Sequence, residues 1–214
     1  MTHELAQFER RLVGQLRRRW ALLLREARDA FEKSYFEFHL AREGGSMTLG
    51  ATERKFEGAI EAWLLDHGGY VKGNPSAFDI ALGLDPGEVL AFVRATQQQA
   101  WSNLVARHGG EGAAETNFLK RLAKELDDRG TVDVLRHGVK DFGVEARIAY
   151  FRPAHGLTPE LVASYEANRL VLVRQFRYED SDKTIDLALY VNGIPVATAE
   201  LKNPLTNQNV EHAI

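Results

Sequence analysis

The period of the hydrophobic pattern changes near Gly138, and this change limits the possible folds more than any other feature of the sequence. Before Gly138, apolar residues recur at spacings of three and four, as in Phe118, Leu119 and Leu122, which is typical of helices. After it, apolar and polar residues alternate, which is typical of strands. We therefore expect residues 52–138 to be almost entirely helical and the following residues to form a sheet.

The helical part has recognisable starts and stops. Thr52 is expected to cap one helix and Gly68-Gly69 to end it, while Pro86 opens another. After Gly138, we expect a short helix from Thr158-Pro159, and strands at residues 146–151, 169–178, 185–191 and 194–201. A further helix begins near residues 207–209 and is cut off at residue 214, so we expect the chain to be a fragment of a longer protein.

Residues 1–46 are treated as a separate helical arm. Nine Lys and Arg residues are interleaved there with seven Asp and Glu residues, which favours a solvated helix face over a basic arm that binds DNA or a partner. Gly44-Gly45-Ser46 resembles a flexible linker, and the arm is either a fusion or a natural extension. The expected domains are thus the arm 1–46, a helical part 47–138 and a sheet core 139–214 that is truncated at its C-terminus.

Composition excludes several kinds of site. The chain has no cysteine, which excludes disulfide scaffolds, zinc-thiolate sites and thiol nucleophiles and fits a cytoplasmic location. No apolar run is long enough to cross a membrane. The net charge of -3 means that any binding to nucleic acid must depend on local basic patches rather than on the overall field.

Residues with catalytic potential gather in the last hairpin. Asp186 is followed after thirteen residues by Glu200-Leu201-Lys202. Two carboxylates suit Mg²⁺, which prefers oxygen ligands, and a nearby lysine can orient or deprotonate a water or stabilise a charged transition state. The sequence therefore suggests a magnesium-dependent phosphodiesterase.

Whether the two acids share a face depends on the loop. A two-residue turn without a bulge would point Asp186 away from Glu200, whereas a three-residue loop would pair Asp186 with Thr198 and place Glu200 diagonally. The second register also gathers Ile185, Leu187, Leu189 and Val191 with Pro195, Ala197, Ala199 and Leu201 on one apolar face. We therefore expect the three-residue loop, although a surface hairpin with scattered charges is the alternative.

The run Asp186-Leu187-Ala188-Leu189-Tyr190-Val191-Asn192-Gly193-Ile194-Pro195, closed by Glu200-Leu201-Lys202-Asn203-Pro204, resembles the N-terminal nuclease domain of type I restriction enzyme R subunits. Residues 135–141, 165–170 and the helix from Thr52-Glu53 are similar to segments of the same subunits. The resemblance implies an α/β fold: a PD-(D/E)xK (restriction-endonuclease-like) core with a mixed sheet, preceded by a mostly helical region.

The resemblance also implies roles for residues and partners. Asp186 and Glu200 would bind Mg²⁺, Lys202 would be the third signature residue, and Glu53, with Glu57 as its rival, would be an additional acid. The enzyme would be a type I site-specific deoxyribonuclease acting on double-stranded DNA, with methyltransferase and specificity subunits as partners. ATP would be used only by a translocase in the full-length subunit, since this sequence has no Walker motif.

Two other functions remain open. Residues 52–138 or the arm could form a docking module for partner subunits, with no activity in the isolated fragment. Alternatively, the chain could belong to a PD-(D/E)xK nuclease of a repair or phage system, which would cut DNA without ATP or partners.

Overall fold

The computed structural model describes residues 49–154, 157–178 and 183–201, with side chains from Glu57 onward. The helices predicted within residues 1–43 and from residues 207–209, and Lys202, lie outside the described residues. The chain divides into two compact units, one that contains helix α2 (Leu49–His67) and one that spans Gly69–Glu200. Each unit is described by itself.

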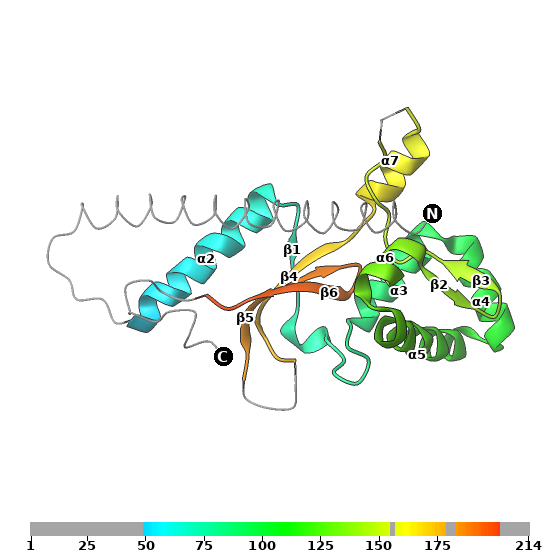
Figure 1. The fold of residues 1–214 in the computed structure, drawn as a ribbon, viewed down its shortest axis with the longest axis horizontal. Helices are drawn as coiled ribbons and strands as arrows, with labels where there is room; N and C mark the ends of the chain where they lie inside the picture. The colour runs from blue at the N-terminus through cyan, green and yellow to red at the C-terminus, as the bar shows by residue number, and fades with distance from the viewer. Residues whose placement is uncertain (1–48, 155–156, 179–182, 202–214) are drawn as a thin grey trace, which may run out of the picture. The chain divides into compact units, whose positions relative to one another are not determined.

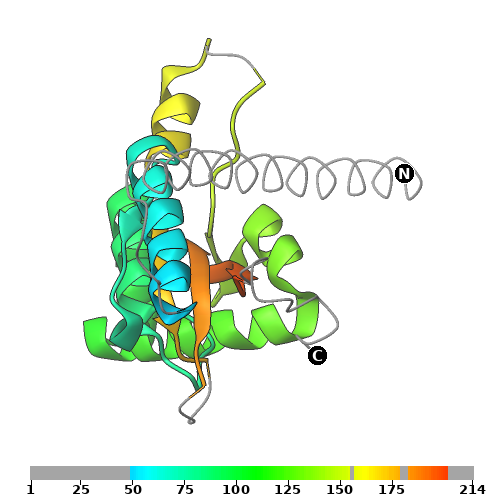
Figure 2. The same cartoon turned by 90° about the vertical axis from the view of Figure 1, so that its left-hand side faces the viewer.

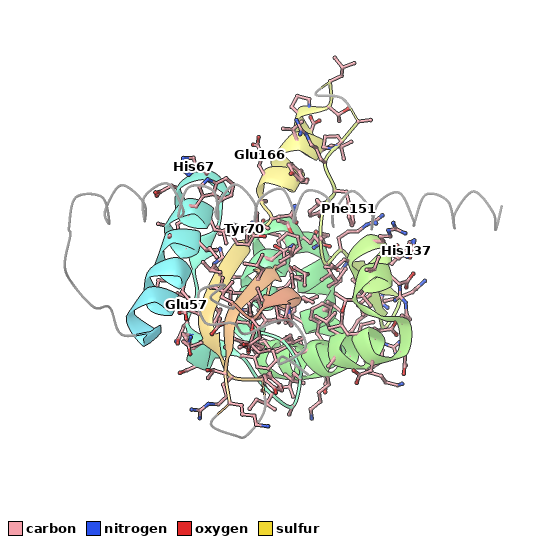
Figure 3. All side chains as sticks on the ribbon, turned by 60° about the vertical axis from the view of Figure 1, so that its left-hand side comes forward. Glu57, His67, Tyr70, His137, Phe151 and Glu166 are labelled. Atoms are coloured by element: carbon pink, nitrogen blue, oxygen red, sulfur yellow. The ribbon has the colours of Figure 1, made fainter. Side chains whose placement is uncertain are left out.

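Helix α2 begins at Leu49, so the predicted start at Thr52 is wrong by three residues. Its predicted end is confirmed, since the amide of Gly68 donates to the carbonyl of Leu64 and Gly69 adopts a left-handed φ of 72°. The buried positions are Glu57, Ile60, Glu61 and Leu64; Glu57 is labelled on the helix in Figure 3. Spacings of three and four place all of these side chains on one side of the helix.

The second unit opens with one short strand and a single 3₁₀ turn, β1 (Val71–Lys72) and η1 (Pro75–Ala77). The sequence did not predict this strand. Four helices follow: α3 (Pro86–Thr96), α4 (Gln98–His108), α5 (Glu111–Arg129) and α6 (Thr131–His137). The helix predicted to open at Pro86 is confirmed, and the Asp85 side chain caps it by accepting from the amide of Glu88. No helix among the described residues is both long and apolar enough to span a membrane.

These helices enclose the larger core together with a small hairpin, β2 (Val139–Asp141) and β3 (Val144–Ala146). Figure 1 shows the hairpin beside α4 at one side of the sheet. The strand predicted at 146–151 is wrong, because pairing ends at Ala146. The amide and carbonyl of Tyr150 instead bond the Asn168 side chain, which replaces a ladder partner.

The chain then runs through helix α7 (Pro159–Glu166) into β4 (Leu170–Phe176), β5 (Ile185–Val191) and β6 (Ile194–Ala199). The predicted helix at Thr158-Pro159 and the last three predicted strands are thereby confirmed; β5 has the predicted bounds, whereas β4 and β6 are shorter than predicted. The sheet order is β1-β4-β5-β6, in which β1 runs parallel to β4 and the other neighbours are antiparallel. The fold is therefore α/β with a mixed sheet that follows a mostly helical region, as predicted.

A smaller core lies on the sheet itself. It contains Val171, Val173, Phe176, Ala188 and Tyr190, with Phe78 packed against it. Ile194, at the start of β6, belongs instead to the core of the helices. Figure 2 shows the strands side by side at the centre of this unit, with α5 crossing below them. The β5–β6 hairpin is thus fixed at its turn by the helical core and continues away from it.

Candidate active site

The hairpin turn consists of two residues, so the predicted three-residue loop is wrong. Val191 pairs with Ile194, and only Asn192 and Gly193 lie between them. Both have positive φ, 51° for Asn192 and 83° for Gly193, as the hairpin turn preferred by Asn-Gly requires. The turn residues therefore follow the tight geometry rather than the longer loop inferred from the apolar pattern.

A tight turn alone would pair Asp186 with Ala199. A β-bulge in β6 shifts the register of β5 and β6 by one residue. Tyr190 pairs with Pro195 and Leu189 pairs with Ala197, so Val196 has no partner across the ladder. Beyond the bulge, Ala188 pairs with Thr198 and Leu187 with Ala199. The predicted pairing of Asp186 with Thr198 is therefore wrong.

Continued by one residue, the same register puts Asp186 directly opposite Glu200. Residues directly opposite each other have their Cβ atoms about 4.5–5.5 Å apart. If the register continues in this way, a bulge rather than a longer loop brings the two acids onto one face. We call this pair the open end of the hairpin and Asn192-Gly193 the turn end.

The predicted apolar face is confirmed beyond the bulge, where Leu187 pairs with Ala199 and Leu189 with Ala197, but the opposite face of β5 is not polar. Leu187 and Leu189 are buried, but so are Ala188 and Tyr190, which alternate with them on the face of Asp186. Pro195 pairs with Tyr190 and so lies on that second face. Because β5 is covered on both faces, its alternation does not reveal the register.

At the open end, Asp186 is partly buried and Glu200 is exposed. Gln175 of β4 lies between Arg174 and Phe176, which pair with Leu187 and Ile185, and its Nε2 donates to Asp186 Oδ1 over 3.5 Å. Gln175 has a φ of 49° in the interior of a strand, a conformation that costs a residue other than glycine about 1–3 kcal/mol. Sequence reasoning missed Gln175, and no local pattern marks it.

The turn end is organised around a fully buried asparagine. The Asn192 side chain accepts from the amide of Arg169 at 2.7 Å and donates to the carbonyl of Ile148 at 2.8 Å and to Asn168 Oδ1 at 2.9 Å. Asn168 in turn bonds the backbone of Tyr150 in both directions. Side-chain amides thus join the hairpin turn to segments that lie far apart in the sequence.

The same turn rests against the start of α3. The amide of Asp85 donates to the carbonyl of Gly193, and a Cβ on Gly193 would lie 2.5 Å from the Asp85 carbonyl oxygen. Burial raises the pKa of the Asp85 carboxyl, and its hydrogen bond from the Glu88 amide opposes that shift. Burial also raises the pKa of the nearby Tyr190 hydroxyl, with a smaller contribution from the Asp85 charge. The turn end is therefore closely packed and weakly solvated.

Basic residues near the hairpin divide between its two ends. Arg169 precedes β4 at the turn end, where its Nη2 lies 3.0 Å from Glu88 Oε1. Arg174 pairs with Leu187 and so lies on the face opposite Asp186. Arg177 directly follows β4, and Lys183 comes shortly before β5. Both are exposed and lie next to the open end. Of these four basic residues, Arg177 and Lys183 are therefore the two that adjoin the open end and are exposed.

Asp186 and Glu200 are the residues of the described sheet that suit a metal ion. Facing carboxylates repel each other, and a divalent cation with oxygen ligands relieves that repulsion. Within residues 57–154, 157–178 and 183–201, no group of three or more His, Cys, Asp and Glu side chains could hold a metal. Glu57 is buried on α2, in the other unit, and the side chains of Glu53 and Lys202 lie outside the described residues.

Comparisons with known proteins agree with the sequence resemblance. A family model described as type I restriction enzyme R protein N terminus matches residues 102–214, which is more than half of the chain and includes the whole β5–β6 hairpin. No curated protein and no solved structure matches the chain significantly. The chain belongs to the family of type I restriction enzyme R protein N-terminal regions.

Proposed function

We propose that this chain carries the nuclease centre of a type I restriction enzyme R subunit and takes part in Mg²⁺-dependent hydrolysis of double-stranded DNA. The observation that supports this proposal is the pairing of Leu187 with Ala199, which, continued by one residue, would bring Asp186 opposite Glu200, in a chain of a restriction enzyme family. The core would be of the PD-(D/E)xK type. Lys202 would be its lysine, and either Glu53 or Glu57 would be an additional acid.

Each group has a distinct task in this proposal. Asp186 and Glu200 bind Mg²⁺ through their carboxylate oxygens, and the Lys202 ammonium group orients the attacking water or stabilises the charged transition state. When bound, Mg²⁺ activates water and neutralises charge on the phosphate. Arg177 and Lys183 contact the DNA backbone, since such phosphate contacts position DNA without reading its sequence.

The rest of the assembly would supply recognition and movement. A specificity subunit recognises the DNA site, methyltransferase subunits complete the complex, and an ATP-dependent translocase lies elsewhere in the full-length R subunit. The complex would act in the cytoplasm. This division of tasks fits a net charge of -3 on the present chain, because most contacts to DNA phosphates come from other parts of the complex.

Substituting the acids in a complete R subunit, assembled with its partners, ATP and Mg²⁺, tests the proposal. We expect Asp186→Asn and Glu200→Gln to lower the rate of DNA cleavage by about a thousandfold, since a catalytic metal contributes several kcal/mol. ATP hydrolysis should remain unchanged. Glu145→Gln, which alters an exposed acid on β3, is the control and should cleave normally.

A docking module is the second candidate function, and α7 favours it. This helix has no buried residue and stands apart from α3–α6 in Figure 1. Leu157 and Leu161, at its start, are 84% and 53% exposed. Apolar surface of this kind often marks a contact site. Normal cleavage by Asp186→Asn would exclude the nuclease proposal and leave docking as the function of the chain.

A further inference from the structure

Gln175 has an unusual backbone conformation for a strand residue, because its φ is positive. Among the described residues, Phe142, Gln175 and Asn192 have positive φ without being glycine. Phe142 and Asn192 each occupy the first position of a two-residue hairpin turn, where positive φ is required. Gln175 lies inside β4, where the ladder requires no such conformation. Its backbone conformation therefore needs a separate explanation.

The side chain of Gln175 is held from both ends. Thr184 Oγ1 donates to Gln175 Oε1 at 3.0 Å, and Gln175 Nε2 donates to Asp186 Oδ1 at 3.5 Å. Because the threonine hydroxyl bonds the amide oxygen, the amide NH₂ group is directed toward the carboxylate. Thr184, Gln175 and Asp186 thus form a short chain of hydrogen bonds on adjacent strands.

The left-handed backbone also has a consequence for packing. Strict alternation would place Phe176 on the face opposite Val173, yet Phe176 is buried in the same core as Val173 and Tyr190. Its ring meets Phe78 and Tyr190 edge-on, with centroids 4.8 and 5.9 Å away. The next residue back, Gln175, stays exposed. The bend at Gln175 therefore has two effects. It buries the Phe176 ring, and it brings the Gln175 amide to Asp186, and these two effects can be tested separately.

We propose that Gln175 is a positioning residue that orients the Asp186 carboxylate for binding a divalent cation. By holding Oδ1 through its amide, Gln175 restricts rotation of the carboxylate. This inference rests on the proposed function, because it assigns Asp186 to the metal site. It adds a residue from β4 to a site that otherwise uses Asp186 of β5 and Glu200, which follows β6.

Gln175→Gly separates the two roles of this residue. Glycine adopts positive φ freely, so the bend and the burial of Phe176 are retained while the amide is lost. We expect a chain that is at least as stable as the wild type but that binds Mn²⁺ roughly three- to tenfold more weakly, as the loss of one long hydrogen bond of ordinary strength predicts. Thr184→Val should weaken Mn²⁺ binding in the same direction and by less.

Mn²⁺ binding to the 214-residue chain, followed by electron paramagnetic resonance, is the measurement, with thermal unfolding alongside. The Mg²⁺ concentration that gives half-maximal DNA cleavage by the complete complex should rise by the same factor, with little change at saturating Mg²⁺. If Asp186→Asn abolishes Mn²⁺ binding while Gln175→Gly leaves it unchanged, the positioning role is wrong and the proposed function stands. If Asp186→Asn leaves Mn²⁺ binding unchanged, the metal site fails and the positioning role fails with it.

Discussion

The two ends of the β5–β6 hairpin are built in opposite ways. At the turn end, Asn192 is fully buried, its amide bonds three partners, and Gly193 packs against Asp85 and Val89. At the open end, Asp186 is partly buried and Glu200 is exposed, and Gln175 reaches Asp186 through a long hydrogen bond. The comparison teaches that the most distinctive part of the sequence, Val191 to Pro195, maintains the fold, while residues suited to chemistry lie at the other end.

The largest effect should come from breaking the alignment of the open end. Inserting one alanine between Thr198 and Ala199 would move Glu200 to the opposite face of β6, because side chains alternate along a strand. We expect DNA cleavage by the complete complex to fall about a thousandfold, since Glu200 could no longer share an ion with Asp186.

Deletion of Val196 is the matched control for this insertion. It removes the bulge but keeps Leu187 opposite Ala199 and Asp186 opposite Glu200. Cleavage should therefore stay within a few-fold of the wild type. Equal loss of cleavage in the two variants would show that the alignment alone is not sufficient and that the bulge is needed as well.

Gly193→Ala tests the turn end through stability. The new Cβ would meet the Asp85 carbonyl oxygen at 2.5 Å and the Val89 amide nitrogen at 2.7 Å, at a φ of 83°. We expect the free energy of unfolding to fall by about 3 kcal/mol or more, measured by urea denaturation. Gly83→Ala has a similar φ, with nothing within 4 Å of its Cβ, and should cost only about 1 kcal/mol. Equal losses would mean that Gly193 is needed for its φ alone.

Asn192→Gly separates the side chain from the backbone of the same turn. Glycine keeps the positive φ, so the change removes only the hydrogen bonds of the amide. The carbonyl of Ile148 and the amide of Arg169 would lose these partners, which should lower the free energy of unfolding by about 2 kcal/mol. A denaturation midpoint equal to that of the wild type would show that water replaces the amide at no cost.

Much of this fold follows from residues near each other in the sequence. Pro86 and the glycines at 109, 130 and 138 mark helix ends, and Asn192-Gly193 marks a hairpin. The bulge at Val196 and the bend at Gln175 could not be predicted, because each depends on packing against other strands. The strand predicted at 146–151 failed for a similar reason: Asn168, far along the chain, takes the hydrogen bonds of Tyr150.

The candidate site shows the same division. Spacing and resemblance point to Asp186, Glu200 and Lys202. The register favours pairing of the two acids through the bulge at Val196, which the sequence does not predict. Gln175 has no signal in the sequence, because its relation to Asp186 exists only once β4 and β5 pair. Residues that act through long-range pairing are therefore the ones that sequence reasoning misses.

The smallest expected effect concerns the charge of Asp85 at the turn end. Burial is the main cause that raises the pKa of this carboxyl. Its raised pKa in the folded state means that the folded chain holds the proton more tightly than the unfolded chain, so stability is lost as the pH rises from the unfolded pKa through the folded pKa.

Asp85→Asn keeps a good helix cap and removes this loss. We therefore expect a small gain in stability at neutral pH and a smaller decline in stability as the pH rises above the ordinary pKa of an aspartate, measured by urea denaturation at several pH values. Asp85→Ala, which loses the cap, should instead be destabilised by about 1 kcal/mol; a loss of stability in Asp85→Asn at neutral pH would mean that the turn end requires the carboxylate charge.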